Sequence, residues 1–198
     1  MRIGVLAIQG DVREHIRHIE TAGAEALPVR LAHDLDSTQG LIIPGGESTT
    51  IGMLMEEYGI IDAIKDRAKD GRYPIYGTCA GMILLAKNVI GLSPARLGLI
   101  DMDVSRNAYG RQIASFEVGL SIAALGIEPF PAVFIRAPKI QRWGSGVTPL
   151  AWYEKELVMA EAGPYLISSF HPEMSPDIRI HQYFLEKVRQ AATLVDAS

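Results

Sequence analysis

The sequence from residue 73 to residue 87 is YPIYGTCAGMILLAK. Its first four residues, Tyr73 to Tyr76, are apolar and predict a short buried strand, and Met82 to Lys87 predict an apolar helix. Cys79, the only cysteine of the chain, falls at the turn between them, with a glycine two residues away on either side. A strand, a sharp turn and a helix in this order are typical of α/β folds whose turn carries a nucleophile.

Cys79 is therefore a candidate nucleophile. The flanking glycines of such a turn keep side chains out of the space where strand and helix approach each other. The positive end of the helix dipole also favours the thiolate form of a cysteine at this position. The alternative is a structural residue, because free cysteine is among the most buried residue types. The turn by itself leaves both interpretations open.

A second motif, Ser169-Phe170-His171-Pro172-Glu173, follows the strand-like run Tyr165 to Ile167. A thiol needs a base, and imidazole serves near neutral pH when a carboxylate fixes its tautomer and supports its positive charge. Residues i and i+2 of an extended segment point to the same side, so we expect Glu173 to hydrogen-bond His171. An isolated His-x-Glu could equally be a structural histidine beside a solvated glutamate. Together with the cysteine turn, however, it favours catalysis.

A third motif is the glycine-containing loop from Pro44 to Thr50, which lies between a β-like run and an apolar helix pattern. Two adjacent glycines at the end of a strand can direct backbone N–H groups at a developing oxyanion, and the residue after the nucleophile can supply another donor. We therefore expect the oxyanion hole to consist of the Gly46 and Ala80 N–H groups. A plain loop in which Ser48 or Thr49 caps the helix is the simpler alternative, and it does not exclude this role.

With these motifs the sequence resembles the class I (Triad) glutamine amidotransferases. Within that class it is most similar to the glutaminase subunits of pyridoxal 5'-phosphate synthases, and the similarity runs from about Arg2 to about Val188. The segments that carry it are Gly4 to Gly10, Val12 to His15, Pro44 to Thr50, Gly77 to Gly81, Arg106-Asn107, Tyr109 to Gln112, Ser115 to Glu117, Phe134 to Pro138 and Ser169 to Glu173.

The resemblance implies a triad and a substrate. Cys79 would attack the side-chain amide of L-glutamine, His171 would pass a proton to the departing ammonia, and Glu173 would orient His171. The glutamine contacts that the resemblance implies are Gly46, Glu47, Ser48, Arg106, Ile135 and Arg136. An arginine suits the α-carboxylate of glutamine because its planar fork matches a carboxylate. The alternative for either arginine is a surface ion pair.

The resemblance also implies a partner. Ammonia would pass to a separate synthase subunit, a (β/α)₈-barrel protein that forms a multimeric ring core and builds pyridoxal 5'-phosphate. The chain itself would need no cofactor and no metal. The helix Asp11 to Glu20 and the loops near the site are candidate docking surfaces. Gln9, at the end of the first predicted strand, is expected near the mouth of the site.

Three other functions fit the sequence less well. A glutaminase serving another ammonia acceptor, such as an imidazole glycerol phosphate synthase partner, is disfavoured by the segments Gly110-Arg111-Gln112 and Ile135 to Pro138. A noncatalytic binding module of the same fold is disfavoured because Cys79, His171 and Glu173 are all present. A cysteine peptidase or esterase built on the same turn would not need the arginines.

Composition narrows the class of protein further. Hydrophobic residues make up 48% and charged residues 21% of the 198, which is ordinary for a globular enzyme. A formal charge of −4 argues against general nucleic-acid binding. A single cysteine excludes an intrachain disulfide and fits a reducing cytoplasm, and neither a signal peptide nor a membrane-spanning run is predicted. His15 and His18 share one helix face, and we expect them to be exposed or at an interface rather than metal ligands.

The order of the predicted elements indicates the fold. Strand-like and amphipathic helical segments alternate up to residue 87, which predicts a three-layer α/β/α arrangement around a mostly parallel sheet. Short β runs from Leu97 to Tyr165 predict a mixed or antiparallel extension, with Trp143 in a loop that covers an apolar patch. A closing helix from about Pro176 to Ala192 and a flexible tail from about 190 to 198 would complete one glutaminase domain spanning residues 1–198.

Overall fold

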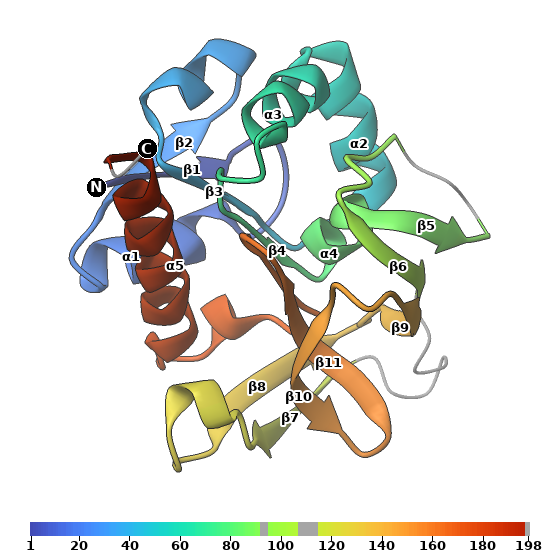
Figure 1. The fold of residues 1–198 in the computed structure, drawn as a ribbon. Coiled ribbons are helices and arrows are strands. Elements are labelled where there is room, and N and C mark those ends of the chain that lie inside the picture. Colours follow the sequence, from blue (N-terminus) through green and yellow to red (C-terminus); the bar gives the residue numbers. More distant parts are fainter. Residues whose placement is uncertain (92–94, 107–114, 197–198) are drawn as a thin grey trace.

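The computed structural model describes residues 1–91, 95–106 and 115–196, and its centre is a β-sheet (Figure 1). The parallel strands of this sheet are β1 (Arg2–Leu6), β2 (Glu25–Val29), β3 (Gly40–Ile43), β4 (Ile75–Thr78) and β12 (Tyr165–Ser168). Two antiparallel strands, β10 (Thr148–Tyr153) and β11 (Glu156–Ala162), extend it at one edge. In the described part of the chain the strand order is β10-β11-β12-β4-β3-β1-β2. The predicted mostly parallel sheet is therefore confirmed.

Helices cover both faces of the sheet (Figure 1). On one face lie α1 (Val12–Thr21) and α5 (Arg179–Asp196), and on the other lie α2 (Ser48–Glu57), α3 (Ile60–Ala68) and α4 (Ala80–Leu85). Alternate residues of β3 supply the two hydrophobic cores: Leu41 and Ile43 pack with the second group of helices, and Ile42 packs with the first. The predicted three layers follow from this alternation.

Most of the remaining strands lie in the predicted β extension, but Ala86–Ile90 is a strand where a helix was expected as far as Lys87. One small sheet has the order β5-β6-β9, and β7 pairs with β8 in an antiparallel ribbon. Their bounds are β5 (Ala86–Ile90), β6 (Ile100–Ser105), β7 (Ser115–Leu120), β8 (Phe130–Ile135) and β9 (Lys139–Trp143). Short 3₁₀ turns are η1 (Ala32–Ser37), η2 (Ala123–Leu125) and η3 (Pro172–Met174).

Trp143 ends a strand, although a glycine-flanked loop was expected around it. Its neighbour residues pair with β6, and the register places Trp143 opposite Met102. The indole packs against the hydrophobic core and meets the ring of Trp152 edge to face, with 5.7 Å between ring centroids. Pairing with β6, which is distant in sequence, decides the strand, and local glycines could not reveal it.

The histidines of α1 correct another expectation. His15 and His18 were expected to be exposed or at an interface, yet their exposed fractions are 0% and 6%. Both rings contact His181 of α5, which supplies hydrogen-bonding partners for nitrogens that would otherwise be buried unpaired. Hydrophobic periodicity counts histidine as polar and therefore placed this face of the helix toward solvent.

The last helix begins later and ends later than predicted. The Asp177 carboxylate accepts a hydrogen bond from the Arg179 N–H at 3.0 Å and so fixes the start of α5. Helical structure continues to Asp196, so the segment expected to be a tail is helical over most of its length. None of the helices in the described ranges combines the length and the hydropathy that a bilayer-spanning segment needs.

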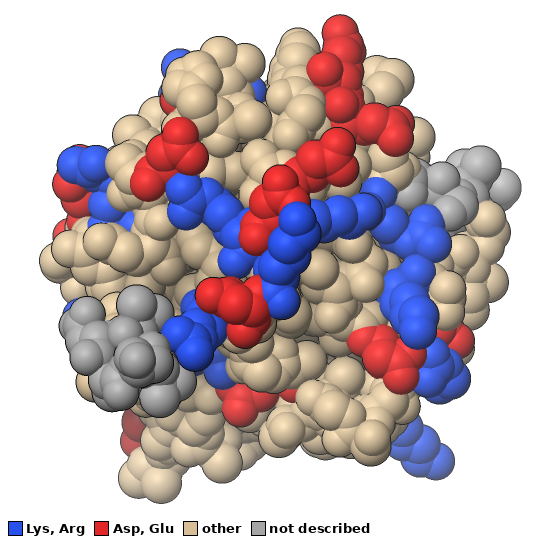
Figure 2. Space-filling view, turned by 45° about the horizontal axis from the view of Figure 1, so that its top comes forward, with Lys and Arg blue, Asp and Glu red and all other residues tan. Residues whose placement is uncertain are grey.

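Acidic and basic side chains are mixed on the face shown in Figure 2. Lys and Arg residues lie next to Asp and Glu residues there. This mixing accords with the formal charge of −4.

The turn at Cys79 fixes how β4, α4 and β3 meet. Cys79 has a φ of 48°, a conformation that is sparsely populated for residues with a side chain. A Cβ atom added at Gly81 would collide with the carbonyl oxygen of Ile43 in β3, and one added at Gly77 would lie 2.6 Å from the carbonyl carbon of Gly81. Only glycine at these two positions lets the three backbones approach this closely.

Replacing Gly81 with alanine tests this close approach. We expect Gly81→Ala to lower the free energy of unfolding by about 3 kcal/mol, because the backbone of β3 cannot move aside without breaking the sheet. Urea unfolding followed by circular dichroism measures the change. Gly146→Ala is the control, since nothing lies within 4 Å of a Cβ atom there. Equal stabilities of the two variants would contradict the assigned packing.

Candidate active site

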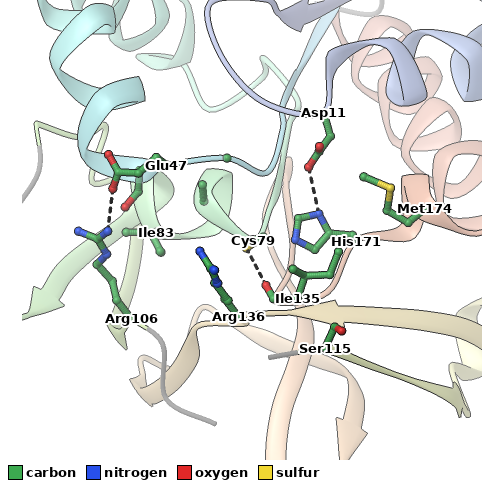
Figure 3. Close-up of a pocket in the computed structure, with 13 residues that line it drawn as sticks. Asp11, Glu47, Cys79, Ile83, Arg106, Ser115, Ile135, Arg136, His171 and Met174 are labelled. Carbon is green, nitrogen blue, oxygen red and sulfur yellow. Dashed lines mark hydrogen bonds and ion pairs between the residues drawn. The ribbon is translucent and has the colours of Figure 1, made fainter. Parts of the chain in front are cut away.

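The candidate site lies where β3, β4 and β12 end. These strands are neighbours and parallel, so their carboxyl ends meet at one edge of the sheet. A pocket of about 510 Å³ opens there (Figure 3). The residues expected from the sequence that line it are Gly46, Glu47, Ser48, Cys79, Ala80, Arg106, Ile135, Arg136 and His171. Its further lining residues, which the sequence analysis did not single out, are Asp11, Ile83, Ser115 and Met174.

Cys79 is held at the pocket by its backbone. Its N–H donates a hydrogen bond to the Ser168 carbonyl of β12 at 2.8 Å, and α4 begins at the next residue. The sulfur faces the Ile135 carbonyl at 3.9 Å (Figure 3). Because the strained turn leaves little freedom, the thiol is presented to the pocket rather than to the core.

His171 and Glu173 form the hydrogen bond that their spacing suggested. Nδ1 of His171 lies 2.9 Å from Oε1 of Glu173, and the Glu173 side chain has no exposed surface. The two residues are not in an extended segment, however. His171 is followed by the 3₁₀ turn η3, which contains Glu173, and this turn brings the carboxylate to the ring.

Asp11 is a second carboxylate beside His171, and the sequence analysis missed it. Its Oδ2 lies 3.3 Å from Nδ1 of His171 (Figure 3). That nitrogen carries a single proton, so the shorter contact with the buried Glu173 takes the hydrogen bond and Asp11 acts through its charge. The position of Asp11 just beyond the first strand, at the same edge of the sheet as the other motifs, was the available indication.

The surroundings of His171 favour its charged form. Burial of the ring lowers its pKa, but the adjacent Asp11, Cys79 and Glu173 side chains outweigh burial and raise the pKa to about 12. His171 is therefore an imidazolium over the physiological range. An imidazolium at this position can donate a proton to a group bound in the pocket.

Glu47 caps α2. Its side chain accepts hydrogen bonds from the backbone N–H groups of Thr49 at 3.1 Å and Thr50 at 2.7 Å. Partial burial raises its pKa, but these bonds prevail and lower the pKa to about 2. The cap expected at Ser48 or Thr49 is thus wrong, because the longer Glu47 side chain reaches both amides. The Ser48 hydroxyl is buried and, among the described residues, has no hydrogen-bond partner.

The two arginines of the pocket differ. Arg106 donates to Oε1 of Glu47 at 2.7 Å and to the Thr49 hydroxyl at 2.8 Å, so it is the ion pair that the sequence left as an alternative (Figure 3). Arg136 follows β8 with a φ of 45° and forms no ion pair within the described residues. Among the described residues that line the pocket, Arg136 is thus the arginine without a carboxylate partner.

Gln9 holds the glycine loop. Its Oε1 accepts a hydrogen bond from the Glu47 N–H at 2.8 Å, and a Cβ atom at Gly46 would lie 2.5 Å from the same oxygen. The carbonyl of Gly45 in turn accepts a hydrogen bond from the Asp11 N–H at 3.3 Å. Gln9 therefore lies beside the loop, near the site as expected, and acts on its backbone.

One set of donor atoms has the compactness of a metal site. Atoms of Asp11, His171 and Glu173 lie within 4.8 Å of one another. A metal ion there would have to displace the proton that the raised pKa of His171 retains. The set is better suited to holding an imidazolium than to holding a metal.

A cysteine on a strained turn after β4, with a histidine and a carboxylate beyond the end of the adjacent parallel strand β12, is typical of α/β enzymes that use a cysteine nucleophile. Residues 5–190 match the SNO glutamine amidotransferase family, and the chain belongs to that family. The resemblance inferred from the motifs is thereby confirmed.

Several known proteins are similar over nearly the whole chain. Pyridoxal 5'-phosphate synthase subunit PdxT of Moorella thermoacetica is 50% identical over 188 residues, which cover 95% of this chain and 100% of that protein. PdxT of Thermotoga neapolitana is 47% identical over 189 residues, with 96% and 100% covered. A crystal structure of a glutamine amidotransferase is 48% identical and superposes with a TM-score of 0.89, covering 94% of this chain and 98% of that one.

Part of the resemblance falls outside the described residues. Asn107 and the segment Tyr109 to Gln112, including Gly110-Arg111-Gln112, belong to that part. The segment Phe134 to Pro138 lies at the end of β8 and contributes Ile135 and Arg136 to the pocket.

Glu47→Ala tests the cap. We expect it to lower the free energy of unfolding by about 1 kcal/mol near neutral pH. Because the pKa of Glu47 is lowered from 4.5 to about 2, its contribution is present above pH 4.5 and is lost as the pH falls toward 2. The gap between wild type and variant in urea unfolding should narrow over that range. Glu57→Ala, at the other end of α2, is the control and should change stability by less than about 0.5 kcal/mol.

Proposed function

We propose that this chain is a glutaminase that hydrolyses L-glutamine to L-glutamate and ammonia, and that Cys79, His171 and Glu173 are its catalytic triad. The observation that carries the proposal is the strained cysteine turn next to a buried histidine whose pKa is raised to about 12. The whole chain, residues 1–198, would act as one glutaminase domain.

The geometry supports a two-step acyl transfer. The Cys79 thiolate adds to the amide carbon of glutamine, and the N–H groups of Gly46 and Ala80 stabilise the oxyanion that forms. The carbon–nitrogen bond then breaks, and His171 protonates the leaving nitrogen to give ammonia and a thioester. His171 next takes a proton from water, whose oxygen attacks the thioester. The thiolate leaves, and glutamate is released.

The pocket also offers contacts for the α-amino acid end of glutamine. Arg136 is assigned to the α-carboxylate, because Arg106 is already paired with Glu47. Arg106 then acts through Glu47, whose carboxylate faces the pocket and suits the α-ammonium group. The unpartnered Ser48 hydroxyl and the Ile135 carbonyl, together with Gly46, complete the proposed contacts.

The ammonia acceptor in this proposal is the synthase subunit of pyridoxal 5'-phosphate synthase, a (β/α)₈ barrel in a multimeric ring. Identities of about 50% to PdxT subunits support this acceptor over an imidazole glycerol phosphate synthase partner. A noncatalytic module of the same fold is disfavoured because the nucleophile, the base and the orienting carboxylate are all in place. A cytoplasmic location is also part of the proposal and rests on the single cysteine and the resemblance.

Cys79→Ala is the first test. We expect it to lower glutamate release from glutamine by at least about 10³-fold, because no other thiol exists in the chain. Release is measured with and without the synthase subunit, and wild-type turnover should rise when that subunit is added. The variant should unfold at the same urea concentration as wild type. Retained turnover in Cys79→Ala would refute the assignment of the nucleophile.

Loss of the base should lower activity more than loss of the orienting carboxylate. His171→Asn removes the proton carrier and is expected to lower kcat nearly as much as loss of the thiol, while Glu173→Gln keeps the ring and should lower kcat less. Glutamate release measured for both variants decides the ranking. Identical losses in both would contradict the separate roles.

A further inference from the structure

Three histidines lie behind Glu173 on the side away from the pocket. His15 and His181 have no exposed surface, and His18 is 6% exposed. Nδ1 of His15 lies 2.9 Å from Nε2 of His181, and Nδ1 of His181 lies 3.1 Å from Nδ1 of His18. The rings thus form a continuous chain between α1 and α5, which lie side by side in Figure 1.

One end of this chain reaches the proposed triad. Nε2 of His15 lies 3.4 Å from Oε2 of Glu173 and 3.3 Å from the Thr78 hydroxyl oxygen. Oε1 of Glu173 is engaged by His171, and Oε2 is buried without a hydrogen-bond partner among the described residues. A buried carboxylate oxygen is costly unless a donor faces it. Nε2 of His15 is the donor that faces this oxygen. The same nitrogen also faces the hydroxyl of Thr78, the residue before Cys79.

The three rings are neutral. Burial lowers the pKa of His15 and of His18, and it holds the pKa of His181 well below its usual value. The negative charge of Glu173 raises the pKa of His15, but burial has the larger effect. A neutral imidazole carries one N–H, so each link in the chain fixes the tautomer of the next ring. Only two arrangements are possible, one in which every ring donates toward Glu173 and one in which every ring donates away from it.

The surroundings of His18, at the far end of the row of histidine rings, decide between the two hydrogen-bond arrangements. His18 and Ser175 line an open pocket of about 420 Å³, and the Ser175 carbonyl lies within hydrogen-bonding reach of His18. Water can reach that end and can satisfy the carbonyl if His18 does not. Nothing comparable can reach Oε2 of Glu173, whose side chain has no exposed surface. Donation toward Glu173 therefore satisfies the group that is more costly to leave unpaired.

We propose that His15 is a positioning residue that donates its Nε2–H to Oε2 of Glu173, and that His181 and His18 fix the tautomer that makes this possible. His18 donates from Nδ1 to His181, and His181 donates from Nε2 to His15. With both oxygens held, the Glu173 carboxylate cannot rotate, and its contact with His171 keeps one geometry. The catalytic part of this inference rests on the proposed function, but the hydrogen-bond arrangement does not.

The arrangement is tested directly by ¹⁵N NMR of the full chain labelled at histidine. We expect Nε2–H tautomers for His15 and His181 and an Nδ1–H tautomer for His18, with each signal assigned by its absence in a single variant. His33, whose side chain is 72% exposed, is the reference for a ring in contact with solvent. The opposite three tautomers, or a doubly protonated His15, would overturn the inference, whatever the enzymatic activity.

The catalytic part is tested by two replacements of similar volume. His15→Gln places an amide donor where Nε2 lies, whereas His15→Met fills the space without a donor. With the synthase subunit present, we expect His15→Met to lower kcat about 10- to 100-fold with little change in KM, and His15→Gln to retain most of kcat. Alkylation of Cys79 by iodoacetamide, which has no other thiol to react with, should slow in His15→Met alone.

The controls separate the possible failures. His33→Gln should match wild type in kcat, KM and alkylation rate. Equal losses in His15→Gln and His15→Met would show that His15 acts only through packing and would overturn the positioning role. If wild type does not hydrolyse glutamine while its alkylation still depends on the donor at position 15, the proposed function falls and the positioning of the triad stands.

Discussion

The structure depends on the close approach of three backbones around Cys79. Gly81 lies against the Ile43 carbonyl of β3, and Gly77 lies against Gly81, so no side chain separates α4 from the sheet. The turn between them can be made only with Cys79 at positive φ. This strain is maintained because the core on that face of the sheet holds α4 in place. The sulfur is consequently fixed at the edge of the sheet where the neighbouring loops converge.

Charge is confined to one side of Glu173. Toward the pocket, the positive charge of the His171 imidazolium is compensated by the carboxylates of Glu173 and Asp11. Toward α1 and α5, the buried imidazoles of His15 and its neighbours are neutral because burial lowers their pKa values. Burying a charge is tolerable when it is paired, and burying a polar ring is tolerable when it is hydrogen-bonded. The charged groups of the pocket and the neutral histidines meet at the Glu173 carboxylate. Its Oε1 faces His171, and its Oε2 faces His15.

The polar residues of the pocket are of two kinds: some are paired with other protein groups, and some have no such partner among the described residues. Glu47 and Arg106 hold each other and the start of α2, so their contacts are made before any substrate arrives. Arg136 and the Ser48 hydroxyl lack such partners among the described residues. Small-molecule pockets carry a few precisely placed polar groups that fix the orientation of a ligand, and the paired residues here hold the shape of the pocket around the unpaired ones.

Several elements of this protein can be predicted from local sequence patterns. The glycine-flanked cysteine turn, the His-x-Glu motif, the glycine loop and the alternation of strands and helices follow from steric needs and from periods of 2 and 3.6 residues, and together they predicted the fold class, the family and most of the pocket. The folded chain adds three features: Asp11 contacts His171, Glu47 caps its helix, and His15 and His18 are buried. These contacts depend on side-chain reach and on the packing of segments distant in the chain, which no local pattern encodes.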